Sequence, residues 1–105
     1  RDFAYLVADY VEREHEVSFY ADRINITTKY LSDICKQKIG KGAKEIISEV
    51  LISNLKREVK MSGLSLKEIS YKYAFADQSS MGKFFRKMTG VSPIEFKQAG
   101  GMKID

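Results

Sequence analysis

The same order of residue types occurs twice in this sequence, at an offset of fifty positions. Aligning Gly40 with Gly90 also aligns Thr27 with Asp77, and both of these last residues favour the position that caps the start of a helix. The apolar positions that follow correspond as well: Leu31 with Met81, Ile34 with Phe84, and Cys35 with Phe85. An internal repeat of this kind predicts two similar structural units in one chain.

Each copy of the repeat predicts two helices joined by a turn. In the first copy, a short helix over 16–23 precedes a turn at Asn25 and a helix over Thr28–Lys38. In the second copy, Ser65 caps a short helix, and a turn one residue longer leads to a helix over Gln78–Thr89. A short helix, a turn and a second helix with a polar outer face are typical of a helix-turn-helix.

The longest amphipathic segment, Ala43–Met61, lies between the two copies. Its apolar residues recur at steps of three and four, and Ser62-Gly63 follows as a helix stop. A helix of this length spans about 28 Å. We therefore expect an all-α fold of about seven helices, with a first helix that ends near Glu14. The expected fold contains helix-turn-helix units at 1–42 and 63–98, a linker helix at 43–62 and a tail at 99–105.

The formal net charge of +4 is unevenly distributed along the chain. Residues 1–16 carry two basic and five acidic side chains, so residues 17–105 carry a net charge of +7. This gradient favours a polyanionic partner, and a solvated basic surface explains it about as well. No apolar run approaches the roughly 20 residues of a membrane span. The single cysteine excludes an internal disulfide and a zinc-ligand cluster.

Each copy also contains specific runs of residues beyond the helical pattern. The second copy contains Ile69-Ser70, Ala74-Phe75-Ala76-Asp77-Gln78-Ser79-Ser80-Met81, Phe85-Arg86-Lys87, Thr89-Gly90-Val91-Ser92-Pro93 and Phe96-Lys97. The first copy contains Tyr20-Ala21, Ile26-Thr27, Lys29-Tyr30-Leu31-Ser32 and Gly40. Together these runs resemble the signature of the DNA-binding domain of AraC/XylS-type transcription regulators, and the resemblance covers about Val17 to Lys97.

The resemblance implies a function and a set of partners. Domains of that family bind two adjacent major grooves of double-stranded DNA and contact or recruit RNA polymerase. They follow a sensing or dimerising region, which agrees with a sequence that begins at Arg1 without an initiator Met. We expect a bacterial, cytoplasmic protein with no cofactor. Successive major grooves lie about 34 Å apart, and a linker helix of about 28 Å with its end connections can span that distance.

The base-contacting positions of the family correspond to polar outer faces of the two long helices. In the first helix these positions hold Lys29, Ser32 and Asp33, with Thr28 and Lys36 beside them. In the second helix they hold Gln78, Ser79, Gly82 and Lys83, and Arg86, Lys87 and Lys72 are expected to contact phosphates. Lysine can donate to guanine, and glutamine can bridge the adenine edge.

Two of these positions, Asp33 and Gly82, each allow two interpretations. The apolar residues on the opposite side of the first long helix are expected to be buried. Asp33 either accepts from cytosine or orients Lys29 or Lys36 through an ion pair. At Gly82, either the backbone approaches the bases very closely or the position contacts nothing. The buried face of the first long helix is expected to hold Leu31, Ile34, Cys35 and either Lys38 or Ile39.

Four residues depart from the family pattern. Ala74 stands where the family usually has Gly, so the turn there is expected to differ slightly. Met81 and Cys35 replace phenylalanines and are expected to fill the core, and Ser92 replaces Thr while keeping a capping hydroxyl. None of these changes is expected to alter the fold.

Other functional classes remain as alternatives. A helical protein-interaction module without specific DNA binding would use the same outer faces for a protein partner, and a nonspecific nucleic-acid binder would lack sequence preference. An enzyme is disfavoured, because the only histidine, His15, and the only cysteine, Cys35, lie on different predicted elements. No phosphate-binding glycine loop is present, since Gly40-Lys41-Gly42 lacks the rest of that motif.

Overall fold

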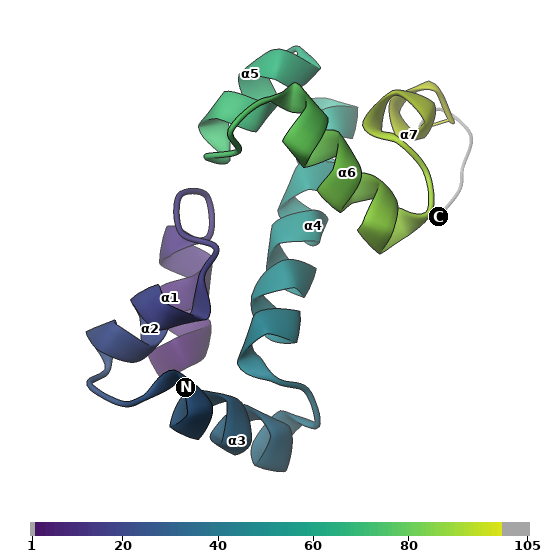
Figure 1. Ribbon diagram of the computed structural model, residues 1–105. Helices are drawn as coiled ribbons and strands as arrows, with labels where there is room; N and C mark the ends of the chain where they lie inside the picture. Colours follow the sequence, from purple (N-terminus) through teal and green to yellow (C-terminus); the bar gives the residue numbers. More distant parts are fainter. Residues whose placement is uncertain (1, 100–105) are drawn as a thin grey trace. The chain divides into compact units, whose positions relative to one another are not determined.

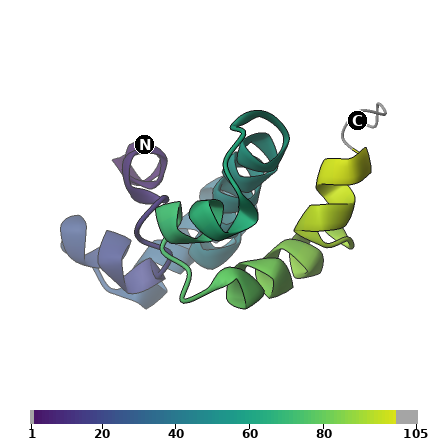
Figure 2. The same cartoon turned by 90° about the horizontal axis from the view of Figure 1, so that it is seen from above.

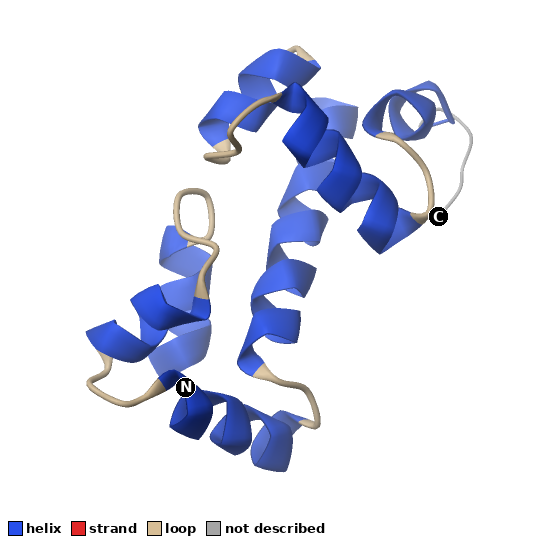
Figure 3. Cartoon of the chain, viewed as in Figure 1, coloured by secondary structure: helices blue, strands red, loops and turns tan. Residues whose placement is uncertain are grey.

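All regular structure is α-helical in the computed structural model, which describes residues 2–99 (Figure 1, Figure 3). The seven helices of this range are α1 (Asp2–Tyr10), α2 (Val17–Arg23), α3 (Thr28–Ile39), α4 (Ala43–Met61), α5 (Leu66–Lys72), α6 (Gln78–Thr89) and α7 (Pro93–Ala99). The predicted all-α fold is confirmed. None of these helices is long and apolar enough to cross a membrane. The chain divides into two compact units, Arg1–Leu51 and Ile52–Asp105, and the boundary falls inside α4.

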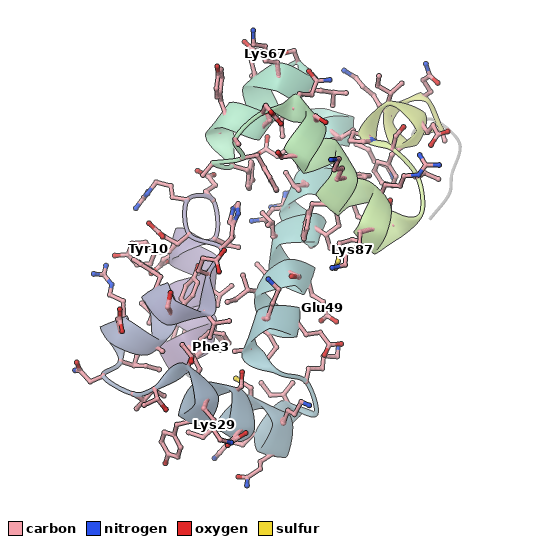
Figure 4. The ribbon with its side chains drawn as sticks, viewed as in Figure 1. Phe3, Tyr10, Lys29, Glu49, Lys67 and Lys87 are labelled. Carbon is pink, nitrogen blue, oxygen red and sulfur yellow. The ribbon has the colours of Figure 1, made fainter. Side chains whose placement is uncertain are left out.

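The first unit is built from α1, α2, α3 and the N-terminal half of α4. Helix α2 contacts both α1 and α3. The ring of Phe3 meets the ring of Tyr20 edge-on, with 5.8 Å between centroids, and Figure 4 shows Phe3 among the helices of this unit. Burial of apolar side chains drives this packing. The other buried apolar residues of the unit are Val7, Val11, Ala21, Leu31, Cys35, Ala43, Ile47 and Leu51.

Tyr20 connects this core to the segment between α1 and α2. Its side chain is buried, and its hydroxyl donates to the main-chain carbonyl of Glu14 at 2.6 Å. Burial, helped by the negative charge of Glu14, raises the pKa of Tyr20 to about 12. The hydroxyl therefore stays protonated and keeps donating at any physiological pH.

Three residues define the helix-turn-helix of the first unit. Asn25 has a left-handed backbone with φ 60°, a conformation that asparagine tolerates better than most residues. Thr27 caps α3, because its hydroxyl oxygen accepts from the N–H of Tyr30 at 3.0 Å. Gly40 ends α3 with φ 89°. The predicted turn, cap and stop are all present.

The second unit repeats this arrangement with the C-terminal half of α4, α5, α6 and α7. Helix α6 contacts both α5 and α7, and Figure 2 shows the three helices in succession. The ring centroids of Phe85 and Phe96 lie 5.3 Å apart, and this contact joins α6 to α7. The other buried residues of this core are Ile52, Leu55, Val59, Ile69, Ser70, Tyr73, Met81 and Pro93.

The turn of the second unit spans 73–77, one residue longer than the 24–27 turn of the first, as predicted. Ala74 adopts a left-handed backbone with φ 60°, so the departure from glycine leaves the residue in a conformation that favours glycine. Asp77 caps α6 by accepting from the N–H of Ser80 at 2.8 Å, and the hydrogen bonds from Ser80 hold the pKa of Asp77 below its usual value. Gly90 ends α6 with φ 89°.

Reciprocal caps begin the two short helices of this unit. Ser65 accepts from the N–H of Glu68 at 3.0 Å, while Glu68 accepts from the N–H of Ser65 at 2.8 Å. Ser92 and Glu95 make the same exchange at the start of α7, at 3.1 and 2.8 Å. The capping hydroxyl expected of Ser92 is therefore used.

Glu58 of α4 ties that helix to α5. Its carboxylate lies 2.9 Å from the ammonium of Lys72 and accepts from the hydroxyl of Tyr73 at 2.9 Å. Partial burial acts to raise the pKa of Glu58, but the hydrogen bonds from Lys72 and Tyr73 outweigh it, so the pKa is lowered overall.

A few element limits and orientations differ from the sequence prediction. Helix α1 ends at Tyr10 rather than near Glu14, although hydrogen-bonded turns continue until the N–H of Glu14 donates to the carbonyl of Tyr10. Ile39 is 60% exposed and Lys38 is exposed, so neither lies in the core. They occupy the last turn of α3 before Gly40, beyond the buried part of the helix. Helix α7 includes Ala99, and residues 100–105 of the predicted tail lie outside the described range.

Candidate nucleic-acid interface

The outer face of α3 gathers the polar residues predicted for the first recognition helix. Leu31 and Cys35 fix the opposite face in the core, at 3% and 4% exposure. Burial also raises the pKa of the Cys35 thiol, as expected for an inert core cysteine. The side chains on the outer face are exposed or half-buried: Thr28, Lys29, Ser32, Asp33 and Lys36.

An ion pair links two of these residues. The ammonium of Lys29 lies 3.2 Å from the carboxylate of Asp33, one helical turn away. Asp33 therefore orients Lys29 in the free protein, which is one of the two roles considered for it. The side chains are 84% and 57% exposed, so the pair is worth no more than about 1 kcal/mol and opens readily.

The outer face of α6 gathers the polar residues predicted for the second recognition helix. Met81 and Phe85 anchor α6 with 0% exposure, and the sequence predicted a core position for Met81. Lys87 projects from the C-terminal half of the helix in Figure 4. Gly82 is half-buried, and the remaining residues of the face are exposed: Gln78, Ser79, Lys83, Arg86 and Lys87.

Two of the predicted phosphate-contacting residues make internal ion pairs. Arg86 lies 3.5 Å from Glu95 at the start of α7, and both side chains are more than half exposed. The hydrogen bonds from Ser92, together with the charge of Arg86, lower the pKa of Glu95. Lys72 is held by Glu58, which is only 14% exposed. Arg86 can therefore exchange its partner for a phosphate easily, whereas Lys72 would have to leave a partly buried carboxylate.

Gly82 lies in the middle of α6, where glycine is unfavourable. Glycine costs about 1 kcal/mol relative to alanine at an interior helix position. A Cβ added to Gly82 would meet no described atom within 4 Å, apart from its chain neighbours and the backbone of its own helix. The fold of the described chain therefore gives no packing reason for the missing side chain.

A surface groove accompanies the start of each recognition helix. In the first unit, a groove of about 400 Å³ brings Thr28, Lys29 and Ser32 together with Lys44, the second residue of α4. In the second unit, a groove of about 360 Å³ brings together residues of α5 and α6 and the turn between them. Its lining residues are Lys67, Ser70, Tyr71, Ala76, Asp77, Gln78 and Ser79.

Lys44 and Lys67 were not singled out by sequence reasoning. Both lie at the second position of a helix that precedes or follows a recognition helix, outside the matched motif. The signal that could have found them is their place at a helix start beside the recognition residues. Asp33, Lys36, Gly82, Lys83, Arg86 and Lys87 line neither groove and lie farther along α3 and α6.

The residues predicted to contact DNA on α3 and on α6 belong to different units. Under the repeat offset, Lys29 corresponds to Ser79, Ser32 to Gly82, Asp33 to Lys83 and Lys36 to Arg86. The two faces therefore have the same helical positions and different chemistry. Among the described residues, no three His, Cys, Asp or Glu side chains gather as metal ligands.

Comparison with known proteins identifies a family match. A family model described as "Helix-turn-helix domain" matches residues 20–99. No curated protein sequence matches the chain significantly.

Several solved structures share the fold. The C-terminal domain of AraT, a response regulator from Geobacillus stearothermophilus, has a TM-score of 0.85 at 18% identity, covering 98% of this chain and 84% of that one. An AraC-type DNA-binding domain-containing transcriptional regulator from Chromobacterium violaceum has a TM-score of 0.82 at 14% identity, covering 98% and 92%. The DNA-binding domain of AdpA, a global transcriptional factor solved in complex with a target DNA, has a TM-score of 0.79 at 18% identity, covering 93% and 91%.

Proposed function

The chain belongs to the AraC-type helix-turn-helix family, and from this membership we propose that it binds double-stranded DNA sequence-specifically as the output domain of a transcription regulator. The observation that carries the proposal is the repeated recognition helix. Each unit presents a helix that is anchored by buried residues, capped at its start and polar on its outer face. We propose that α3 and α6 enter adjacent major grooves of one duplex.

The side chains divide by the part of DNA that they can contact. We assign base contacts to Lys29, Ser32, Asp33, Gln78, Ser79, Gly82 and Lys83, as the family resemblance implies, and to Thr28 beside them. Lys36, Arg86 and Lys87 are assigned to phosphates, because they lie farther along the helices and can approach a strand from the rim of the groove. Lys44 and Lys67 join them, since each lines the groove beside a recognition helix.

Further partners follow from the role of an output domain. We propose contact with RNA polymerase and a linked sensing or dimerising region. The solved AraT structure is the C-terminal domain of a response regulator, which supports such an arrangement. We also propose a cytoplasmic location in a bacterial cell and a binding role rather than a catalytic one.

Selection from a pool of random duplexes at two salt concentrations tests the function. The chain is expected to enrich a motif with two half-sites about ten base pairs apart, with affinity falling steeply as salt rises. Salt-dependent binding without enrichment would indicate a nonspecific binder. No binding at low salt would favour the competing class, a helical protein-interaction module.

A further inference from the structure

The absence of a side chain at Gly82 has no explanation within the described fold. The residue has a helical backbone without a positive φ, so no turn or strained conformation requires glycine there. An alanine would also fit, since its Cβ would enter open space. Glycine weakens an exposed helix because it leaves more backbone freedom to lose on folding. A benefit of Gly82 is therefore to be sought in what the helix binds.

The neighbouring residue on the same face points to a close approach. Ser79 lies one turn before Gly82, and its hydroxyl extends only a short way from the backbone. From this position a serine reaches a base edge only if the helix lies closer to the bases than a lysine at the same position requires. The corresponding pair on α3 is Lys29 and Ser32, and a lysine reaches much farther.

On the basis of the proposed function, we propose that Gly82 lets the backbone of α6 lie against the base edges in the major groove. This contact brings Ser79 within hydrogen-bonding distance of a base, and a side chain at position 82 would hold the helix away. Helix α3, with Lys29 and Ser32 at the equivalent positions, approaches its groove less closely. Gly82 thereby determines specificity by the depth at which α6 binds.

Substitution of Gly82 separates the needs of the fold from those of DNA binding. Gly82→Ala is expected to raise the melting temperature by about 4–8 °C, because alanine favours the helix. The same variant is expected to bind the selected duplex about 10- to 100-fold more weakly, a loss comparable to that of one specific base contact. Gly82→Ser is expected to weaken binding further, because serine is larger than alanine.

Two control variants test the assignment. Ser53→Ala, at an exposed position of α4 outside both recognition helices, should also favour the helix and leave DNA affinity unchanged. Ser32→Gly removes the side chain at the equivalent position of α3 and is expected to lose affinity or leave it unchanged. A gain of affinity in Ser32→Gly would show that α3 also benefits from closer approach, and would overturn the stated difference between the helices.

The remaining outcomes distinguish this inference from the proposed function. If the parent chain selects a motif and Gly82→Ala binds it equally well, the close approach is wrong while the DNA-binding function stands. A lower melting temperature for Gly82→Ala would mean that glycine serves the fold, and would also overturn the inference. If the parent chain selects no motif, both proposals fail together.

Discussion

At the scale of single residues, the two turns contain the same left-handed position with different side chains. Asn25 and Ala74 both have φ 60°. An alanine in this conformation is strained by about 1–2 kcal/mol, whereas glycine adopts it freely at an entropic cost of about 0.5–1 kcal/mol. We therefore expect Ala74→Gly to increase the free energy of unfolding by up to about 1 kcal/mol, measured by urea denaturation.

Asn25→Gly provides the matched control for this prediction. Asparagine already tolerates the conformation, so the change in the free energy of unfolding should be smaller than that of Ala74→Gly. Ala74→Val should destabilise the chain, because a β-branched residue at positive φ is more strained still. A destabilised Ala74→Gly variant would contradict the assignment of strain to this turn.

Lys83 and Arg86 are predicted to contribute to DNA binding in different ways. Lys83→Ala is expected to weaken binding of the selected motif by about 1–3 kcal/mol while affecting unrelated duplexes less. Arg86→Ala is expected to weaken all duplexes alike and to reduce the salt dependence by about one counterion. Fluorescence anisotropy at several salt concentrations measures both effects. A selective loss at one sequence in Arg86→Ala would contradict its phosphate role.

At the scale of elements, the contact between α4 and α5 depends on an ionised carboxylate. Glu58→Gln is expected to reduce the free energy of unfolding at neutral pH by about 1–3 kcal/mol, because Lys72 and Tyr73 lose a charged partner. The folded-state pKa of Glu58 is lowered. Its contribution is therefore complete above the unfolded pKa, about 4.3 for glutamate, and is lost as the pH falls through the lower folded value.

Thermal melts between about pH 3 and pH 7 check this dependence. The stabilities of the parent chain and of Glu58→Gln should converge at acid pH. Glu49→Gln is the control, because Glu49 pairs with Lys41 at 2.9 Å through exposed side chains and should contribute little. A difference between Glu58→Gln and the parent that stays constant down to the lowest pH would contradict the linkage.

Helix limits could be predicted from the sequence most accurately where a helix is flanked by residues that typically start or end helices. The limits of α4 and α6 matched the prediction because their apolar periodicity is interrupted by Gly, Ser or a capping Asp. The end of α1 was misplaced because Val11 continues the apolar stripe and is buried, although it lies in the turn after the helix. Apolar periodicity indicates which side chains point toward the core. A turn after a helix can place a side chain in the same core, so the periodicity does not mark where the helix ends.

Side-chain partners were harder to predict than helices. The Lys29–Asp33 pair could be considered because its partners lie one turn apart on a single helix. The Arg86–Glu95 and Lys72–Glu58 pairs join different helices, so they depend on tertiary placement that no local pattern specifies. Lys44 and Lys67 were missed for the same reason, since only the folded units bring them beside the recognition helices.

At the scale of the whole molecule, paired recognition helices require a phased binding site. DNA completes a turn about every 10–10.5 base pairs, so inserting about five base pairs between the half-sites places them on opposite faces of the duplex. We expect this insertion to reduce affinity to that of a single half-site, and a further insertion to a full turn to recover less than the original affinity. Competition binding with duplexes of graded spacing measures the effect. Equal affinity at all spacings would contradict simultaneous binding by α3 and α6.

The boundary between the two compact units lies within a continuous helix rather than in a loop. Leu51 is buried in the first unit and Ile52 in the second, and the backbone between them remains helical. A cut at this point leaves one fragment with an uncapped helix end and the other with an uncapped helix start. A recombination event that exchanged one recognition unit for another would have to splice inside α4 and preserve its apolar stripe. The shared helix thus favours transfer of the two units together over transfer of one unit alone.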